Sequence, residues 1–119
     1  MHEVGIIAQA LDIAVQRAHE CGARKILAMR LQVGAQSGVV PEALRFGWDV
    51  VTADTCAQGA ALIIDELAAK CRCAECGEVF EPDGPIYACP RCGHFSTDLV
   101  QGRELQVLDI EVELQAEEP

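Results

Sequence analysis

Apolar residues recur at helical spacing near the start of the chain and at alternating positions soon after it. From about Val4 to Cys21 they fall three and four residues apart, which is typical of an amphipathic helix. Gly22 is a natural end for that helix. The next segment, Lys25–Gly34, alternates between apolar and other residues and predicts a half-buried strand. Its predicted inner face carries Leu27, Met29, Leu31 and Val33.

A second helix and two further strands complete the predicted main domain. The helix is expected from Pro41, which suits a first helical turn, to about Asp54. One strand is predicted at 60–67 and another after Gly102, with Leu108, Ile110, Val112 and Leu114 on one face. This order predicts an α+β fold, in which two helices cover one face of a small three-stranded sheet.

The stretch from Cys71 to about Asp98 has a different composition. It holds five of the seven cysteines and three of the five prolines, and it lacks helical periodicity. We expect residues 70–98 to form an inserted, zinc-ribbon-like mini-domain, with residues 1–69 and 99–119 forming the main domain. Because roughly 28 residues cannot bury enough surface to fold alone, a bound metal should stabilise this insert.

Two matching Cys-x-x-Cys-Gly knuckles, at 73–77 and 89–93, are the clearest chemical signal in the chain. Two residues between the cysteines let both sulfurs bind one tetrahedral ion. The glycine suits a turn with positive φ, which can direct backbone N–H groups at the thiolates. We therefore predict a closed structural site made by Cys73, Cys76, Cys89 and Cys92. Zinc is the expected metal, and iron in a rubredoxin-like site is the alternative.

Other thiols and a histidine lie close to these knuckles. Cys71 is either a bystander or a spare ligand that exchanges with Cys73. His94 is a surface group beside the site or a ligand of another metal. Cys21 and Cys56 lie near predicted helix ends and are expected to be structural.

The first three residues, Met1-His2-Glu3, form a chelating arrangement. The α-amine of Met1, the amide nitrogen of His2 and its imidazole can bind one metal through fused rings. Such a nitrogen-rich donor set suits Ni(II) or Cu(II). Glu3 could supply an oxygen ligand or stabilise the helix N-terminus. From spacing alone, a residue at a frayed chain end remains the alternative for His2.

Charge and motifs exclude several functions. The 119 residues include 19 acidic and 9 basic ones, for a formal net charge of -10, which disfavours nucleic acid and anionic membrane surfaces as partners. A zinc-ribbon adaptor for transcription or RNA is therefore disfavoured, whereas an electron carrier with iron stays open. No nucleophile elbow, phosphate loop or carboxylate pair indicates an enzyme. With no apolar run of about 18 residues and no secretory signal, we expect a cytoplasmic protein.

The ordered combination of motifs resembles the HypA/HybF family of hydrogenase nickel-incorporation proteins. The resemblance covers residues from Met1 to about Glu113 and rests on a set of short motifs in the same order. These are Met1-His2-Glu3, Val33-Gly34, Ser37-Gly38-Val39, Pro41-Glu42-Ala43-Leu44-Arg45-Phe46, the two knuckles, and Gly102-Arg103-Glu104-Leu105. One departure is Ala35, where many members carry glutamate, which puts in doubt any nickel or partner contact from that loop.

The resemblance implies a nickel metallochaperone rather than an enzyme. Nickel would be bound by His2, with Met1 and Glu3 assisting, and zinc by the four knuckle cysteines. We then expect pH or nickel to change the zinc coordination, with Cys71 or His94 as the replacement ligand. The implied partners are a HypB-type GTPase and the large subunit of NiFe hydrogenase, and some members also supply urease. An unpaired edge of the small sheet would in addition allow a homodimer or partner pairing.

Overall fold

The computed structural model describes residues 2–82, 87–95 and 98–115. The chain divides into two compact units. The first contains residues 1–32, 39–65 and 106–119, and the second contains residues 33–38 and 66–105. The second unit therefore extends beyond the predicted insert at 70–98, because it also includes 33–38 and the segments on either side of the insert.

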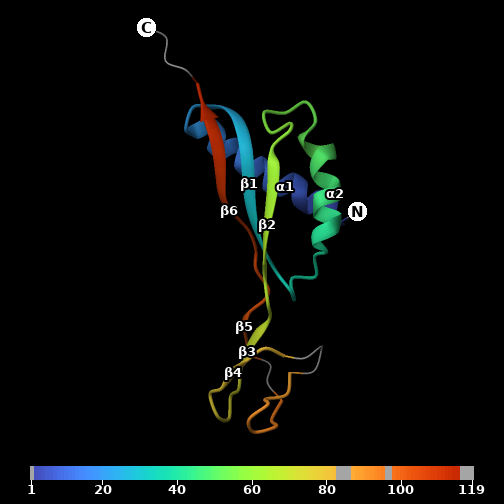
Figure 1. The fold of residues 1–119 in the computed structure, drawn as a ribbon, viewed down its shortest axis with the longest axis vertical. Helices are drawn as coiled ribbons and strands as arrows, with labels where there is room; N and C mark the ends of the chain where they lie inside the picture. The colour runs from blue at the N-terminus through green and yellow to red at the C-terminus, as the bar shows by residue number, and fades with distance from the viewer. Residues whose placement is uncertain (1, 83–86, 96–97, 116–119) are drawn as a thin grey trace. The chain divides into compact units, whose positions relative to one another are not determined.

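Two helices and a three-stranded sheet make up most of the first unit (Figure 1). They are α1 (His2–Glu20), β1 (Ala23–Gly34), α2 (Pro41–Thr52), β2 (Ala61–Leu67) and β6 (Leu105–Leu114). The strand order is β2-β1-β6. Together with the small second sheet described below, this confirms the predicted α+β fold with two helices and three main strands. None of the helices in the described part of the chain is long and apolar enough to cross a membrane.

Helix α1 passes behind the strands in Figure 1 and packs against α2. It buries the stripe that its spacing predicts: Ile7, Ala10, Leu11, Ala14 and Ala18. The two helices approach closely at Gly47, where an added Cβ would lie 3.3 Å from Cγ2 of Ile7. A small residue at this position therefore lets the apolar faces of both helices meet.

Trp48 anchors α2 to the chain that leads into β2. The indole is buried, and its Nε1–H donates a hydrogen bond to the carbonyl oxygen of Ala60 at 2.8 Å. A buried carbonyl that loses its donor costs free energy, because no water replaces the bond.

Trp48→Phe should therefore lower the free energy of unfolding by about 1–3 kcal/mol. Urea unfolding followed by far-UV circular dichroism measures this, since the variant lacks the chain's single tryptophan. Phe46→Leu, at an exposed position of the same helix, is the control and should change stability by less than about 0.5 kcal/mol. Equal stability of Trp48→Phe and wild type would show that this hydrogen bond contributes little.

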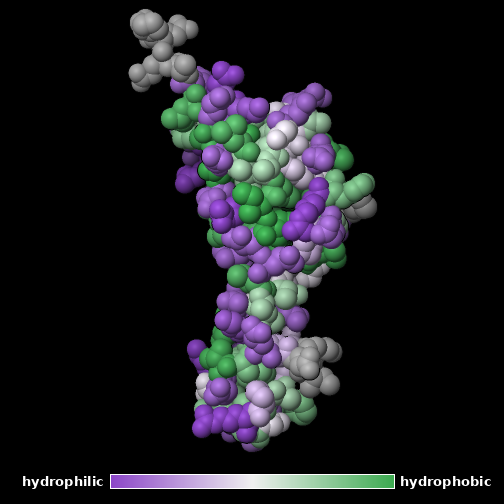
Figure 2. Space-filling model, in the orientation of Figure 1, coloured by the Kyte–Doolittle hydropathy of each residue, from purple (hydrophilic) through white to green (hydrophobic). Residues whose placement is uncertain are grey.

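The inner face of β1 differs from the prediction at its start. Ile26 and Ala28 are buried, and then the buried positions become Met29, Leu31 and Val33. The predicted burial of Leu27 is wrong, because the alternation changes phase after Ala28 and leaves this side chain 39% exposed. On β6, Leu108 and Leu114 are also exposed, because β6 has a neighbouring strand on one side only in the described part of the chain. Figure 2 shows hydrophobic residues at the surface of this unit, among hydrophilic ones.

A second, smaller sheet supports the cysteine-rich segment. It consists of β3 (Lys70–Arg72), β4 (Val79–Phe80) and β5 (Asp98–Gln101), in the order β4-β3-β5. Both pairings are antiparallel. Cys71, Cys73, Phe80 and Cys89 form the core of this unit, with Tyr87 and Leu99 packed against them. The sequence did not predict these strands, which are too short to show a period.

Gly34 lies where two distant motifs of the sequence meet within the second unit. Its N–H donates to the carbonyl of Glu104 at 2.7 Å, and Gln36 donates to the carbonyl of Gly102 at 2.7 Å. An added Cβ at Gly34 would lie 2.1 Å from the Gly102 oxygen, so only glycine fits. Ala35, which departs from the family pattern, is exposed and donates its N–H to Leu67.

Candidate metal centre

The two knuckles have the same backbone geometry. In each, the first cysteine donates its N–H to a carbonyl five residues later: Cys73 to Glu78, and Cys89 to His94, both at 2.8 Å. The glycine four residues after each of these cysteines donates back to its carbonyl, at 2.8 Å in the first knuckle and 2.9 Å in the second. Both glycines have positive φ, 77° at Gly77 and 79° at Gly93, as predicted.

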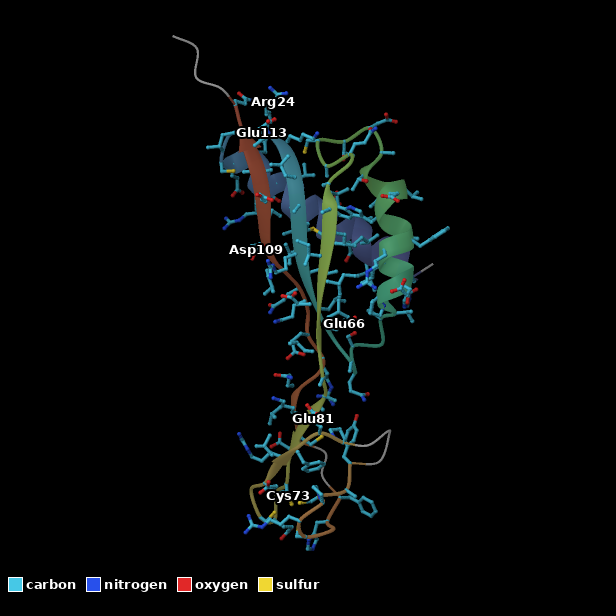
Figure 3. The ribbon with its side chains drawn as sticks, viewed as in Figure 1. Arg24, Glu66, Cys73, Glu81, Asp109 and Glu113 are labelled. Atoms are coloured by element: carbon cyan, nitrogen blue, oxygen red, sulfur yellow. The ribbon has the colours of Figure 1, made fainter. Side chains whose placement is uncertain are left out.

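This geometry brings four sulfur atoms together. The sulfurs of Cys73, Cys76, Cys89 and Cys92 all lie within 4.8 Å of one another. The contacts between knuckles are short: Cys73 Sγ to Cys92 Sγ is 3.4 Å, and Cys76 Sγ to Cys89 Sγ is 3.7 Å. Four thiolates at about 2.3 Å from a central zinc would have sulfur–sulfur distances of about 3.8 Å. The four side chains therefore fit a tetrahedral metal ion; Figure 3 labels Cys73 in this cluster.

Backbone N–H groups and crowding divide the four thiols into two pairs. The N–H of Cys76, assisted by that of Glu75, lowers the pKa of Cys73 to about 6, although desolvation opposes it. At Cys89, desolvation raises the pKa, but N–H groups of the second knuckle and neighbouring thiols outweigh it and lower the pKa. At Cys92, the His94 N–H lowers the pKa, but Cys73, desolvation and the other thiols together raise it to about 12.

The pKa of Cys76 is raised, like that of Cys92. The Glu78 N–H lowers its pKa, but desolvation and its contacts with Cys73 and Cys89 raise the pKa above its ordinary value. The cluster can therefore hold some thiolates by itself, but full ionisation of four neighbouring sulfurs requires a cation among them.

Zinc affinity of the metal-free protein should fall as pH falls, because protons compete with the metal for all four thiolates of the cluster. The loss should be at least about tenfold between pH 7 and pH 6. Competition titration against a chelator of known zinc affinity at the two pH values measures this. Equal affinity at pH 7 and at pH 6 would contradict a site of four thiolates.

His94 and Cys71, the two candidate replacement ligands, lie in different places relative to the four sulfurs. His94 is exposed, and its Nδ1 lies 3.3 Å from the sulfur of Cys92. Cys71 is outside the group of four sulfurs and lies in the core of the unit, where desolvation by burial raises the pKa of its thiol. His94 is thus beside the cluster, whereas Cys71 packs against neighbouring side chains.

The start of the chain belongs to the first unit, whereas the cysteine cluster belongs to the second. His2 is the first residue of α1 and is exposed, and Glu3 lies in the first turn, where a carboxylate is favoured. Met1 lies outside the described residues. Of the other thiols, Cys21 is exposed and donates a hydrogen bond from its Sγ to the Ala18 carbonyl oxygen at 3.3 Å, and Cys56 is partly buried.

The knuckle pattern predicts that backbone N–H groups point at the thiolates, but it does not say that those of Glu75 and Arg91 do so. Each follows a first knuckle cysteine by two residues and points at its sulfur. Their positions follow from the knuckle geometry rather than from their side chains. The spacing of the cysteines was the only available signal for them.

Comparisons with known proteins agree with these features over nearly the whole chain. A family model described as "Hydrogenase/urease nickel incorporation, metallochaperone, hypA" matches residues 1–112. The hydrogenase maturation factor HypA of Geobacter sulfurreducens is 40% identical over 113 residues, which cover 95% of this chain and 100% of that protein. The HypA of Picosynechococcus is 39% identical over 112 residues, covering 94% and 99%.

Solved structures show the same fold. The solution structure of the Ni metallochaperone HypA from Helicobacter pylori has a TM-score of 0.66 at 19% identity and covers 95% of this chain and 98% of that one. A second HypA solution structure has a TM-score of 0.70 at 22% identity, covering 97% and 98%. The chain therefore belongs to the HypA family of nickel-incorporation metallochaperones, which are accessory proteins of hydrogenase maturation and not enzymes.

Proposed function

We propose that this chain binds Ni(II) at its N-terminus, through His2 with Met1 and Glu3 assisting, and delivers it during maturation of NiFe hydrogenase. The observation that supports this most directly is the exposed position of His2 at the first residue of α1, in a chain of a nickel-incorporation family. An exposed terminal site can capture an ion from solution and can also be taken apart by an acceptor.

The helix start supports the chemistry of this site. The first four N–H groups of an α-helix have no intrahelical acceptor, so the His2 amide nitrogen is not engaged by the helix. It can join the α-amine of Met1 and the His2 imidazole in fused chelate rings around Ni(II). Glu3, next in the chain, supplies a carboxylate within the same turn.

Zinc is the metal we propose for Cys73, Cys76, Cys89 and Cys92. The cluster provides four sulfurs and no open position, which is the form of a structural zinc site. A tetrathiolate iron centre would colour the purified protein, so a colourless protein with one equivalent of zinc separates the two metals.

The partners we propose follow from the family role in hydrogenase maturation. They are a HypB-type GTPase, which would supply any nucleotide hydrolysis, and the large subunit of NiFe hydrogenase as the final acceptor. Urease maturation is a second destination consistent with the family description. We propose that delivery takes place in the cytoplasm.

An extension of the N-terminus tests the proposal directly. A Gly-Ser extension ahead of Met1 removes the α-amine from the site but leaves the His2 side chain, so nickel affinity should fall by at least about tenfold. Calorimetric nickel titration of zinc-loaded protein measures it. The same extension after Pro119 is the control and should have no effect. Equal affinity of the two extended proteins would exclude the α-amine as a ligand.

A further inference from the structure

Strand β6 leaves one edge of the three-stranded sheet unpaired. Among the residues that the structure describes, the order β2-β1-β6 gives β6 a single neighbour, and the strand runs over ten residues, Leu105–Leu114, without proline. A long open edge presents unpaired N–H and C=O groups that can accept another strand. The side chains of β6 determine which kind of strand would fit.

The sequence of β6 alternates strictly from Leu108 to Leu114. Apolar residues Leu108, Ile110, Val112 and Leu114 alternate with the carboxylates Asp109, Glu111 and Glu113. Because neighbouring residues of a strand point to opposite faces, one face of the edge is apolar and the other is acidic. An added strand would meet both faces at once.

The apolar face borders a hollow between β6 and α1. A space of about 380 Å³ is lined by Ile13, Ala14 and Arg17 of α1 and by residues 107–110 of β6. Two of its apolar side chains are accessible, Ile13 at 55% and Leu108 at 41% exposure. A second hollow continues along α1 to Cys21 and along β6 to Val112. Apolar side chains of an added strand would be buried here.

The carboxylates of the acidic face stay accessible, although two of them have ion-pair partners on β1. Asp109 lies 3.6 Å from Arg30, and Glu113 lies 3.1 Å from Arg24. Figure 3 labels Asp109, Arg24 and Glu113. Both carboxylates remain about half exposed or more, and Glu111 has no ion pair within the described ranges. Arg17, the basic residue of the hollow, is paired with Glu20 at 3.4 Å.

From this pattern we infer that the free edge of β6 binds an extended basic segment of a partner protein, in which apolar residues alternate with lysine or arginine. Such a segment would place its apolar residues beside the apolar residues of β6, over the hollow. Its cations would lie beside Asp109, Glu111 and Glu113. A second copy of this chain does not fit. If two copies paired through β6 with their apolar residues on the same face of the joined sheet, the carboxylates of one copy would lie opposite those of the other. A shift of one residue would instead place the apolar side chains of the second copy on the opposite face, away from the hollow.

Two labelled peptides of opposite charge provide the probe: acetyl-Lys-Val-Lys-Ile-Lys-Val-Lys-amide and its counterpart with glutamate at every lysine. Fluorescence anisotropy with the zinc-loaded full chain should show the lysine peptide binding at least about tenfold more tightly, with an affinity that falls as salt rises. Amide hydrogen exchange should show new protection at residues 105–114.

Variants separate a specific edge from general acidity. Glu111→Lys should weaken the lysine peptide about threefold or more and strengthen the glutamate peptide, whereas Asp49→Lys, with the same charge change on exposed α2, should alter neither by as much. Ile13→Ser should weaken the lysine peptide without changing its salt dependence. Equal affinities of the two peptides, an equal effect of Asp49→Lys, or a dimer in sedimentation with protected β6 amides would each overturn the proposal.

Discussion

His2→Ala is expected to abolish specific nickel binding while the protein stays folded and zinc-loaded. Even groups that only orient a metal ligand change affinity by about 10–100-fold, so loss of the imidazole itself should cost at least about 100-fold. The fold should be unaffected, because His2 is exposed and the buried stripe of α1 begins at Ile7. Calorimetric nickel titration of the untagged protein, with zinc quantified in the same samples, measures both effects.

The matched control is His19→Ala, which removes an exposed histidine from the last turn of the same helix. It should bind nickel like wild type. Because binding requires loss of protons from the amine and the imidazole, affinity of wild type should fall as pH falls, and this pH dependence should persist in His19→Ala. Unchanged nickel affinity in His2→Ala, or an equal loss in both variants, would remove His2 from the nickel site.

The sequence predicted the elements that bury apolar surface in a regular pattern. Helix α1 was expected at about Val4–Cys21 and is found at His2–Glu20, because one stripe of apolar residues faces the core throughout. Regular alternation likewise predicted β6. The change of phase after Ala28 could not be predicted, because Leu27 is as apolar as Ile26 and only packing decides which of them is buried.

The parts that escaped prediction depend on contacts distant in sequence. Gly34 must be glycine because Gly102 approaches it, and nothing local to either residue shows this. Strands β3, β4 and β5 have two to four residues each, too few to display a period. Cysteine spacing, by contrast, predicted that four sulfurs converge, since each knuckle fixes its own two sulfurs. The roles of the N-terminal residues came from resemblance, because one exposed histidine has little local signal.

Cys89→Ala is expected to lose the metal and to unfold the second unit. The core of this unit consists of few side chains: Cys71, Cys73, Phe80 and Cys89, with Tyr87 and Leu99 against them. Structural zinc supplies about 10–16 kcal/mol in zinc-finger peptides, far more than so small a core can provide. Zinc content should therefore fall from one equivalent to near zero, and amide protection should be lost in β3, β4 and β5 while α1 and α2 retain theirs.

Cys71→Ala separates metal loss from packing loss. Cys71 and Cys89 are both buried in this core, but only Cys89 belongs to the group of four sulfurs. Cys71→Ala should cost about 1 kcal/mol of stability and keep its zinc, whereas wild type treated with a strong chelator should reproduce the exchange pattern of Cys89→Ala. If Cys89→Ala kept its zinc, or kept the protection of β3 after losing it, the fold of this unit would depend on its core rather than on the metal.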